Sequence, residues 1–187
     1  MAHVGPVDLQ VRPGEVVCVS GASGSGKSLL LRAIADIIPH SGNALLDAQA
    51  ATSMPAPQWR KQVALLPAEN QWWHDHVSEH FVQRDVKLLS ALGFAESVWQ
   101  WQLARCSTGE KQRLALLRLL SIQPRCLLLD EPTASLDPDN SERVEALLHD
   151  YINQHQTPVI WVSHSPEQIN RVAARHFSLR DGRLVPV

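Results

Sequence analysis

The chain lacks any long run of apolar residues. Of its 187 residues 44% are hydrophobic, but no apolar stretch approaches the roughly 18 residues that a helix needs to cross a bilayer. Residues 1–5 also lack the charged and then apolar pattern of a secretion signal. We therefore expect a soluble, cytoplasmic protein that folds as one domain with a substantial core.

Excess charge and clustered cysteines are missing as well. The formal net charge is −2 and the basic residues are scattered, so the chain has no electrostatic footprint for nucleic acid, and we expect no DNA or RNA partner. The three cysteines, Cys18, Cys106 and Cys126, are far apart and show no CxxC spacing. This pattern favours reduced core thiols over disulfides or metal ligands.

One glycine-rich stretch lies between a predicted strand and a predicted helix. Val16–Ser20 is short and apolar, as in a buried parallel strand, and residues 29–35 read as a helix. Glycines let successive N–H groups converge on phosphate oxygens, and the helix start adds its positive dipole end. Lys27 is placed to reach the β- and γ-phosphates, and the Ser28 hydroxyl to ligate Mg²⁺. This predicted phosphate-binding loop consists of Gly21, Ala22, Ser23, Gly24, Ser25, Gly26, Lys27 and Ser28.

Carboxylates and a histidine follow two further predicted strands. The apolar strand that begins at Cys126 ends in Asp130 and Glu131. Because side chains alternate along an extended segment, one carboxylate can serve a metal ion and the other a water molecule. The strand Val159–Val162 similarly precedes His164. Since parallel strands gather ligand-binding groups at their carboxyl ends, we expect all these groups at one sheet edge.

The order of elements predicts the fold class. Alternating strands and helices favour an α/β fold: a P-loop NTPase core with a mostly parallel sheet and an antiparallel β portion. Strands are expected at residues 7–11, 43–47 and 63–67, and a hairpin around Asp181 and Gly182. Residues 69–106 hold four of the six tryptophans and a helical pattern from Phe81 to Leu92 that ends at Gly93. We expect a small helical insertion there, with the core formed by residues 1–68 and 107–187.

Four motifs, taken together, resemble those of one protein family. The stretch GASGSGKS looks like a Walker A loop, CSTGEKQR like the LSGGQ signature, LLLDEPTASLD like a Walker B strand with its D-loop, and WVSHS like a switch-histidine segment. Ser107 and Glu110 also form a predicted capping box at the start of a helix. Over essentially the whole chain the sequence resembles the nucleotide-binding domain of ATP-binding cassette (ABC) proteins.

The resemblance implies a role for each matching position. Asp130 would hold Mg²⁺ through its hydration shell, Glu131 would act as general base on water, and His164 would hydrogen-bond the γ-phosphate region. Ser107 and Gly109 would cover the ATP bound by a second copy, and Asp137 would communicate across that dimer interface. ATP and Mg²⁺ are the implied ligands.

The chain departs from the family pattern at three places. Ala68 stands where the family has a metal- and water-sensing glutamine. Glu69 is our expected substitute; the alternatives are Gln71 or the absence of the sensing role. Thr108 and Glu110 replace a glycine and a glutamine of the signature, and Glu110 brings negative charge toward a triphosphate unless its capping bond holds it. His3 is the only ring before Val16 that could stack on adenine.

Two local clusters admit two readings each. The residues His74, Asp75, His76 and His80 could form a metal site if His76 and His80 share a helix face, or simply a polar surface of the insertion. The adjacent Trp72 and Trp73 could receive a cytoplasmic helix of a membrane subunit or pack inside the insertion.

The resemblance implies an ATP-hydrolysing subunit that powers a separate membrane permease. Its location would then be cytoplasmic and peripheral, on the inner face of the cell membrane. The alternatives are a soluble ABC-type ATPase without a permease, or an ATP-dependent clamp whose hydrolysis has decayed. Retention of Glu131 and His164 argues against the clamp.

Overall fold

A six-stranded sheet organises the computed structural model, which describes residues 4–187. The strands lie in the order β4 (Val63–Leu66), β5 (Cys126–Asp130), β6 (Val159–Val162), β1 (Val16–Ser20), β7 (Arg175–Arg180) and β8 (Arg183–Pro186). All neighbouring pairs are parallel except β7 and β8, which form the predicted antiparallel hairpin. A second, antiparallel ladder joins β2 (Leu45–Leu46) and β3 (Gln49–Ala50). The predicted α/β fold with a mostly parallel sheet and an antiparallel portion is confirmed.

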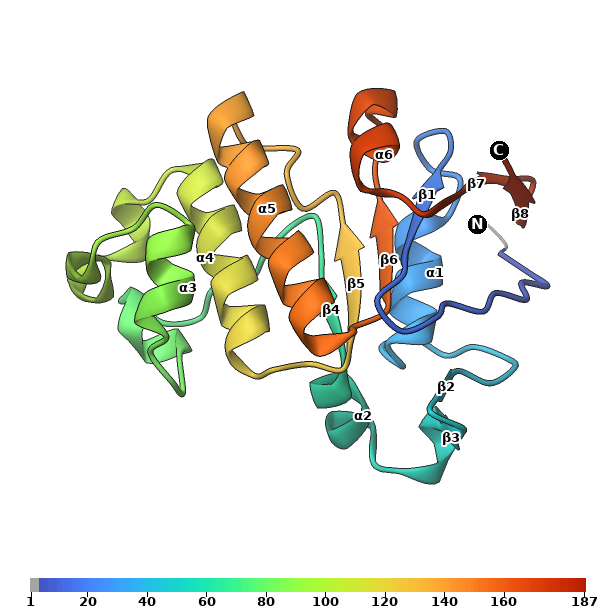
Figure 1. Ribbon diagram of the computed structural model, residues 1–187. Coiled ribbons are helices and arrows are strands. Elements are labelled where there is room, and N and C mark those ends of the chain that lie inside the picture. The colour runs from blue at the N-terminus through green and yellow to red at the C-terminus, as the bar shows by residue number, and fades with distance from the viewer. Residues whose placement is uncertain (1–3) are drawn as a thin grey trace.

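Helices cover both faces of the main sheet (Figure 1). One face packs against α1 (Lys27–Ile34) and α2 (Ala56–Gln62). The other packs against α4 (Thr108–Ser121), α5 (Pro138–His155) and α6 (Pro166–Val172). Alternate strand residues serve the two cores: Cys18 belongs to the cluster that includes α4 and α5, and Val19 to the cluster that includes α1.

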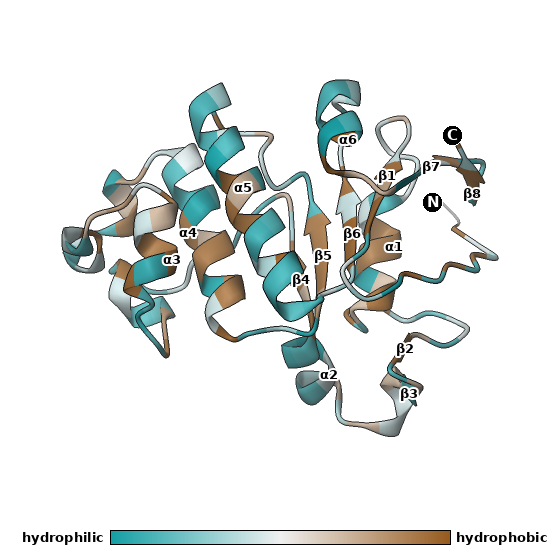
Figure 2. Cartoon of the chain, viewed as in Figure 1, coloured by the Kyte–Doolittle hydropathy of each residue, from teal (hydrophilic) through white to brown (hydrophobic). Residues whose placement is uncertain are grey.

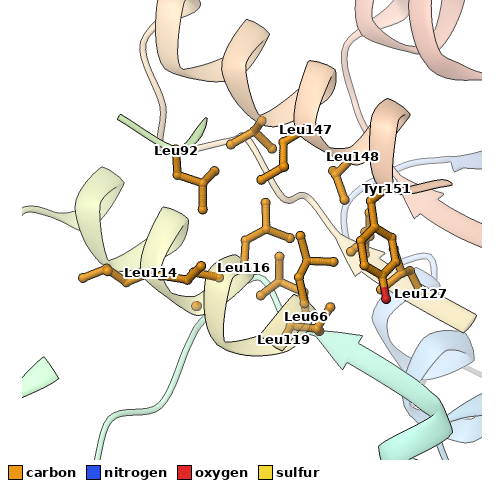
Figure 3. Close-up of a cluster of buried hydrophobic side chains, with 14 of the residues drawn as sticks. Leu66, Leu92, Leu114, Leu116, Leu119, Leu127, Leu147, Leu148 and Tyr151 are labelled. Atoms are coloured by element: carbon orange, nitrogen blue, oxygen red, sulfur yellow. The ribbon is translucent and has the colours of Figure 1, made fainter. Parts of the chain in front are cut away.

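The strands β4, β5 and β6 are almost entirely apolar because both of their faces are covered. Figure 2 shows this as continuous brown along β5, whereas the helices alternate brown and teal. Between α4 and α5 lies a leucine-rich core in which Leu116, Leu127 and Leu148 are fully buried (Figure 3). This packing fixes α4, and therefore the start of α4, relative to the end of β5.

The segment 69–106 lies beyond α4, on the side away from β1 (Figure 1). It contains one α-helix, α3 (Val86–Ala91), and three 3₁₀ turns at Val77–His80, Glu96–Gln100 and Leu103–Arg105. Leu89, Val98 and Trp99 bury their side chains in the same core cluster as α4. The helical character and the end of α3 near Gly93, which has φ 78°, agree with expectation.

Some expected boundaries are wrong. Phe81 lies outside α3, because Asp85 caps that helix by accepting the Leu88 N–H. No strand forms at residues 7–11, because no strand among residues 4–187 pairs with this segment; Leu9 and Val11 pack on the core from irregular backbone. The strand expected at 43–47 shrinks to β2, because Asp47 and Ala48 turn through positive φ.

Candidate functional site

The glycine-rich loop runs from the end of β1 into the first turn of α1. Gly26 has φ 105° just before α1, and Gly21 has φ 147° at the end of β1, conformations that side chains disfavour. A Cβ on Gly21 would lie 2.7 Å from the Leu179 carbonyl oxygen of β7. The loop therefore passes against β7 at a distance that only glycine allows.

Lys27 lies within this loop and is 6% exposed. Its Nζ donates hydrogen bonds to the carbonyl oxygens of Gly21 (2.9 Å) and Ala22 (3.0 Å). Burial lowers the pKa of the Lys27 ammonium, although the carboxylates of Glu131 and Asp130 oppose the shift. The ammonium is thus held at the loop by carbonyl groups and lies in the field of the carboxylates that follow β5.

The loop also holds a polar atom without a partner. The Ser25 hydroxyl oxygen is buried and makes no hydrogen bond to any residue from 4 to 187. It lies 3.0 Å from the position that a Gly21 Cβ would take, and around Gly24 there is open space. A hydroxyl donor, an ammonium and the start of α1 at one concave loop fit an oxyanion such as a phosphate.

The carboxylates at the end of β5 meet the histidine that follows β6. Asp130 pairs in register with Val162, so the turns beyond both strands are adjacent. Glu131 Oε1 lies 3.1 Å from His164 Nε2. Glu131 has φ 51°, and a non-glycine residue in this region stores strain typical of functional sites. The expected meeting of these groups at one sheet edge is confirmed.

Two buried glutamines hold the turn that carries Glu131, and the sequence analysis missed both. Gln168 of α6 donates to Thr133 Oγ1 (2.7 Å) and accepts from Ser163 Oγ (2.8 Å), so it joins the turn after β5 to the turn after β6. Gln112 of α4 donates to the Pro132 carbonyl at 3.2 Å. One signal in the sequence indicated that Gln112 is buried: it lies four residues before Leu116, on the apolar side of a predicted helix.

The predicted capping box opens α4 and is confirmed. Ser107 Oγ accepts the Glu110 N–H (3.2 Å), and Glu110 Oε2 accepts the Ser107 N–H (2.7 Å). The Glu110 carboxylate is therefore held at the helix start. A Cβ on Gly109 would lie 3.1 Å from the Ser135 carbonyl oxygen, so the signature packs against the turn that leads to α5.

Asp137 is the N-cap of α5. It accepts hydrogen bonds from the backbone N–H and the side-chain amide of Asn140, and these bonds lower its pKa. Pro138 occupies the first turn of α5, where its missing N–H costs nothing, and so the helix starts directly after Asp137.

The segment after β4 does not bring Glu69 into any contact. Ala68 and Glu69 are exposed, and among the described residues Glu69 takes part in no hydrogen bond or ion pair. Asn70 instead turns inward, where its Nδ2 donates to Gln112 Oε1 at 2.7 Å.

The histidines near residue 76 form no metal centre. Within residues 4–187 no group of three potential ligands is arranged to hold an ion. His80 is 7% exposed and packs edge-on against the rings of Trp72 and Trp73. Burial lowers the pKa of His80, so it serves as a neutral core ring. His3, the suggested adenine contact, lies outside the described residues.

Comparison with known proteins decides the family. Residues 4–134 match the family model of the ABC transporter. The chain belongs to the ABC transporter family.

Curated ABC relatives align with most of the chain. It is 31% identical over 177 residues to the probable iron export ATP-binding protein FetA of Escherichia coli, covering 88% of this chain and 79% of that protein. It is 36% identical over 185 residues to the aliphatic sulfonates import ATP-binding protein SsuB of Pseudomonas entomophila, covering 94% of this chain and 67% of that protein. The expected identity as an ATP-binding subunit with ATPase activity is confirmed.

Solved ABC structures share the fold. A dimeric ATP-binding cassette in a post-hydrolysis state with ADP and Pi superposes with a TM-score of 0.84 at 23% identity, covering 97% of this chain and 88% of that one. An ATP-bound bacterial exporter of the Atm1 family gives 0.80 at 22% identity, covering 92% of this chain and 33% of that one. Among residues 4–187 no helix has the length and apolar character needed to span a bilayer.

Proposed function

We propose that residues 1–187 form one ABC ATPase domain that hydrolyses MgATP and powers transport through separate membrane permease subunits. The observation that carries this proposal is the Glu131–His164 pair at 3.1 Å, beside a loop that already holds a buried ammonium at Lys27. A carboxylate, an imidazole and an ammonium at one sheet edge supply the groups that phosphoryl transfer to water requires.

The phosphates of ATP would lie in the loop of residues 21–28. Lys27 Nζ would exchange its two carbonyl partners for β- and γ-phosphate oxygens, which as anions bind an ammonium more strongly. The unpartnered Ser25 hydroxyl would donate to a phosphate oxygen and so gain the hydrogen bond that it lacks.

Oxygen ligands suitable for Mg²⁺ stand on both sides of this loop. Ser28, in the first turn of α1, would supply a hydroxyl, and Asp130 would act through water. Asp130 is 5% exposed, and its charge has no ion-pair partner among residues 4–187. The donor set fits a hard divalent cation, which when bound would neutralise charge on the phosphates.

Glu131 would orient the attacking water and accept its proton. His164 lies within hydrogen-bond distance of this carboxylate, so it would hold Glu131 in place and face the γ-phosphate from the β6 side. The Gln168 bridge between Thr133 and Ser163 supports this geometry by tying the two turns together.

A second copy of the chain would complete the site. Ser107 and Gly109 stand at the amino end of α4, where the hydroxyl and backbone N–H groups favour an anion. In an ATP-dependent homodimer this end would cover the partner's γ-phosphate, with Asp137 in the adjacent turn at the interface. The capping bond keeps the Glu110 carboxylate at its own helix start.

The permease would dock on an apolar cleft beside the segment after β4. This cleft has a volume of about 260 Å³. Around it, Ile37 and Ile122 are each nearly half exposed. Trp73 is 64% exposed. It lies near the cleft, since Arg118 lines the cleft and also stacks on the Trp73 ring. Docking there would hold the chain at the inner face of the cell membrane. FetA is named for iron export and SsuB for sulfonate import, so these relatives indicate transport without a common direction or substrate.

The decisive experiment measures ATP turnover by the purified chain with Mg²⁺. Glu131→Gln should abolish turnover and retain ATP binding, whereas Glu96→Gln, an exposed position on the insertion, should match the parent. Absence of turnover in the parent would favour the decayed clamp. Failure of the chain to co-purify with any membrane protein, with turnover intact, would favour a soluble ATPase.

A further inference from the structure

Two side-chain amides connect the segment after β4 to the turn after β5. Asn70 Nδ2 donates to Gln112 Oε1 at 2.7 Å, and Gln112 Nε2 donates to the Pro132 carbonyl oxygen at 3.2 Å. Gln112 is 4% exposed. A loop, the signature helix α4 and the turn that carries Glu131 are thus joined by consecutive hydrogen bonds.

The direction of each bond follows from its chemistry. The Pro132 carbonyl can only accept, so the Gln112 amide nitrogen must face it and the Gln112 oxygen must face Asn70. Asn70 then has to donate through Nδ2. One buried amide group bonds both neighbours, so a displacement of Asn70 would move the same Gln112 side chain that holds Pro132.

Asn70 also borders the cleft beside the segment after β4. Its Oδ1 is buried and has no hydrogen-bond partner among residues 4–187. A buried acceptor without a donor is unfavourable, so a movement of the cleft wall that brings a donor to this atom would be stabilised. The three residues therefore reach from the cleft wall to the residue that follows Glu131.

The position of Pro132 affects the orientation of the neighbouring Glu131. Glu131 is held at φ 51°, and its backbone carbonyl accepts the Ala134 N–H at 3.2 Å. Movement of Pro132 would turn the Glu131 carboxylate, and displacement by about 1 Å can cost a large factor in rate. The residue at position 68, an alanine, cannot supply any such connection from the same segment.

We propose that Asn70 and Gln112 are positioning residues that set the Glu131 carboxylate for catalysis and report the state of the cleft to it. They act on the Glu131 carboxylate through Pro132. This inference rests on the proposed ATPase function and replaces Glu69, which is exposed, as the connection between the segment and the site.

The test compares steady-state ATPase kinetics of Asn70→Ala, Gln112→Met and the double variant with the parent chain. Loss of one neutral hydrogen bond corresponds to a factor of about three to ten. We expect kcat to fall by this factor in Asn70→Ala, which loses one bond, and by at least as much in Gln112→Met, which loses both, with KM for ATP within about twofold. Because the bonds act in series, the double variant should be no slower than Gln112→Met.

Tyr151→Phe is the matched control. Tyr151 Oη donates to the Pro124 carbonyl at 3.1 Å, a buried bond to a proline at the opposite end of β5. Its loss should lower the melting temperature about as much as Gln112→Met does and leave kcat unchanged. This separates positioning of Glu131 from general stability.

Two results would overturn the inference alone: kcat of Gln112→Met equal to that of the parent, or multiplicative losses in the double variant. A parent chain without turnover would overturn the proposed function as well. A lower kcat at unchanged KM, without a further loss in the double variant, supports the inference that Asn70 and Gln112 position Glu131.

Discussion

The capping box at Ser107 and Glu110 offers a test of both stability and dimer closure. Ser107→Ala removes the hydroxyl that accepts the Glu110 N–H, and leaves that N–H without its partner at the start of α4. Glu110→Gln keeps an oxygen that can accept the Ser107 N–H, but removes the negative charge. The two variants therefore separate the hydrogen bond from the charge.

The expected sizes follow from the position of the cap. Replacing an N-cap serine by alanine costs about 1 kcal/mol, which lowers the melting temperature of a domain of this size by about 2–4 °C. Glu110→Gln loses only the attraction between a carboxylate and the helix amino end, about 0.3–1 kcal/mol. Its melting temperature should fall by less than that of Ser107→Ala.

The same charge acts in the opposite direction on dimer closure. The capping bond keeps the Glu110 carboxylate at the start of α4, and in the proposed dimer this same helix start would cover the partner's triphosphate, so the like charges would repel. Glu110→Gln, introduced together with Glu131→Gln to prevent turnover, should therefore dimerise at a lower ATP concentration than Glu131→Gln alone. Raising the salt concentration should reduce the difference because it screens the repulsion.

Thermal unfolding followed by circular dichroism measures stability, and light scattering during gel filtration measures dimer formation. Ser90→Ala, an exposed serine of α3 whose side chain makes no hydrogen bond among the described residues, is the matched control. Equal melting temperatures for Ser107→Ala and Ser90→Ala would refute the expected contribution of the cap to stability. Dimerisation unaffected by Glu110→Gln would refute the electrostatic argument.

Three further predictions concern the loop, the acid range and the cysteines. Gly21→Ala places a Cβ 2.7 Å from the Leu179 carbonyl oxygen, so we expect a loss of about 1–3 kcal/mol in denaturant unfolding and weakened ATP binding. Gly42→Ala, with φ 91° in open space, is the control for backbone strain, and equal losses would refute the clash. Burial acts to raise the pKa of Glu145, but hydrogen bonds from Arg171 and Gln168 outweigh it and hold the pKa below the usual 4.5. The resulting stability is present above pH 4.5 and is lost as pH falls, so the unfolding free energy of Glu145→Gln should decline less between about pH 5 and 3 than that of Glu96→Gln; parallel curves would contradict this. Burial raises the pKa of Cys18 and that of Cys126 to about 12 and also raises the pKa of Cys106, so a thiol reagent at pH 8 should label the native chain only at the rate of unfolding, and rapid labelling would show that a thiol is exposed.

Much of the site was predictable because each motif depends on interactions between residues that are close together in the sequence. Glycines at 21, 24 and 26, between an apolar strand and an apolar helix, allow the positive φ angles that this loop adopts. Ser107 and Glu110 satisfy each other within one helical turn. These preferences act within a few residues, so the sequence by itself determined the glycine-rich loop, the capped start of α4 and the strand ends that carry Asp130 and His164.

Partnerships between distant residues could not be read in this way. The apolar alternation at residues 7–11 predicted a strand, but a strand also needs a neighbour with free backbone groups, and none pairs with it. Glu69 was chosen for its charge and its place in the sequence, whereas the loop after β4 turns Asn70 inward and leaves Glu69 in solvent.

Tertiary structure alone decided which polar side chains share the site. Gln112 and Gln168 resemble many other glutamines until α4 and α6 pack on the sheet and bring their amides to Pro132, Thr133 and Ser163. A hydrogen bond between elements depends on register and distance across the core, which packing of many apolar side chains sets together. No single stretch of sequence contains that information.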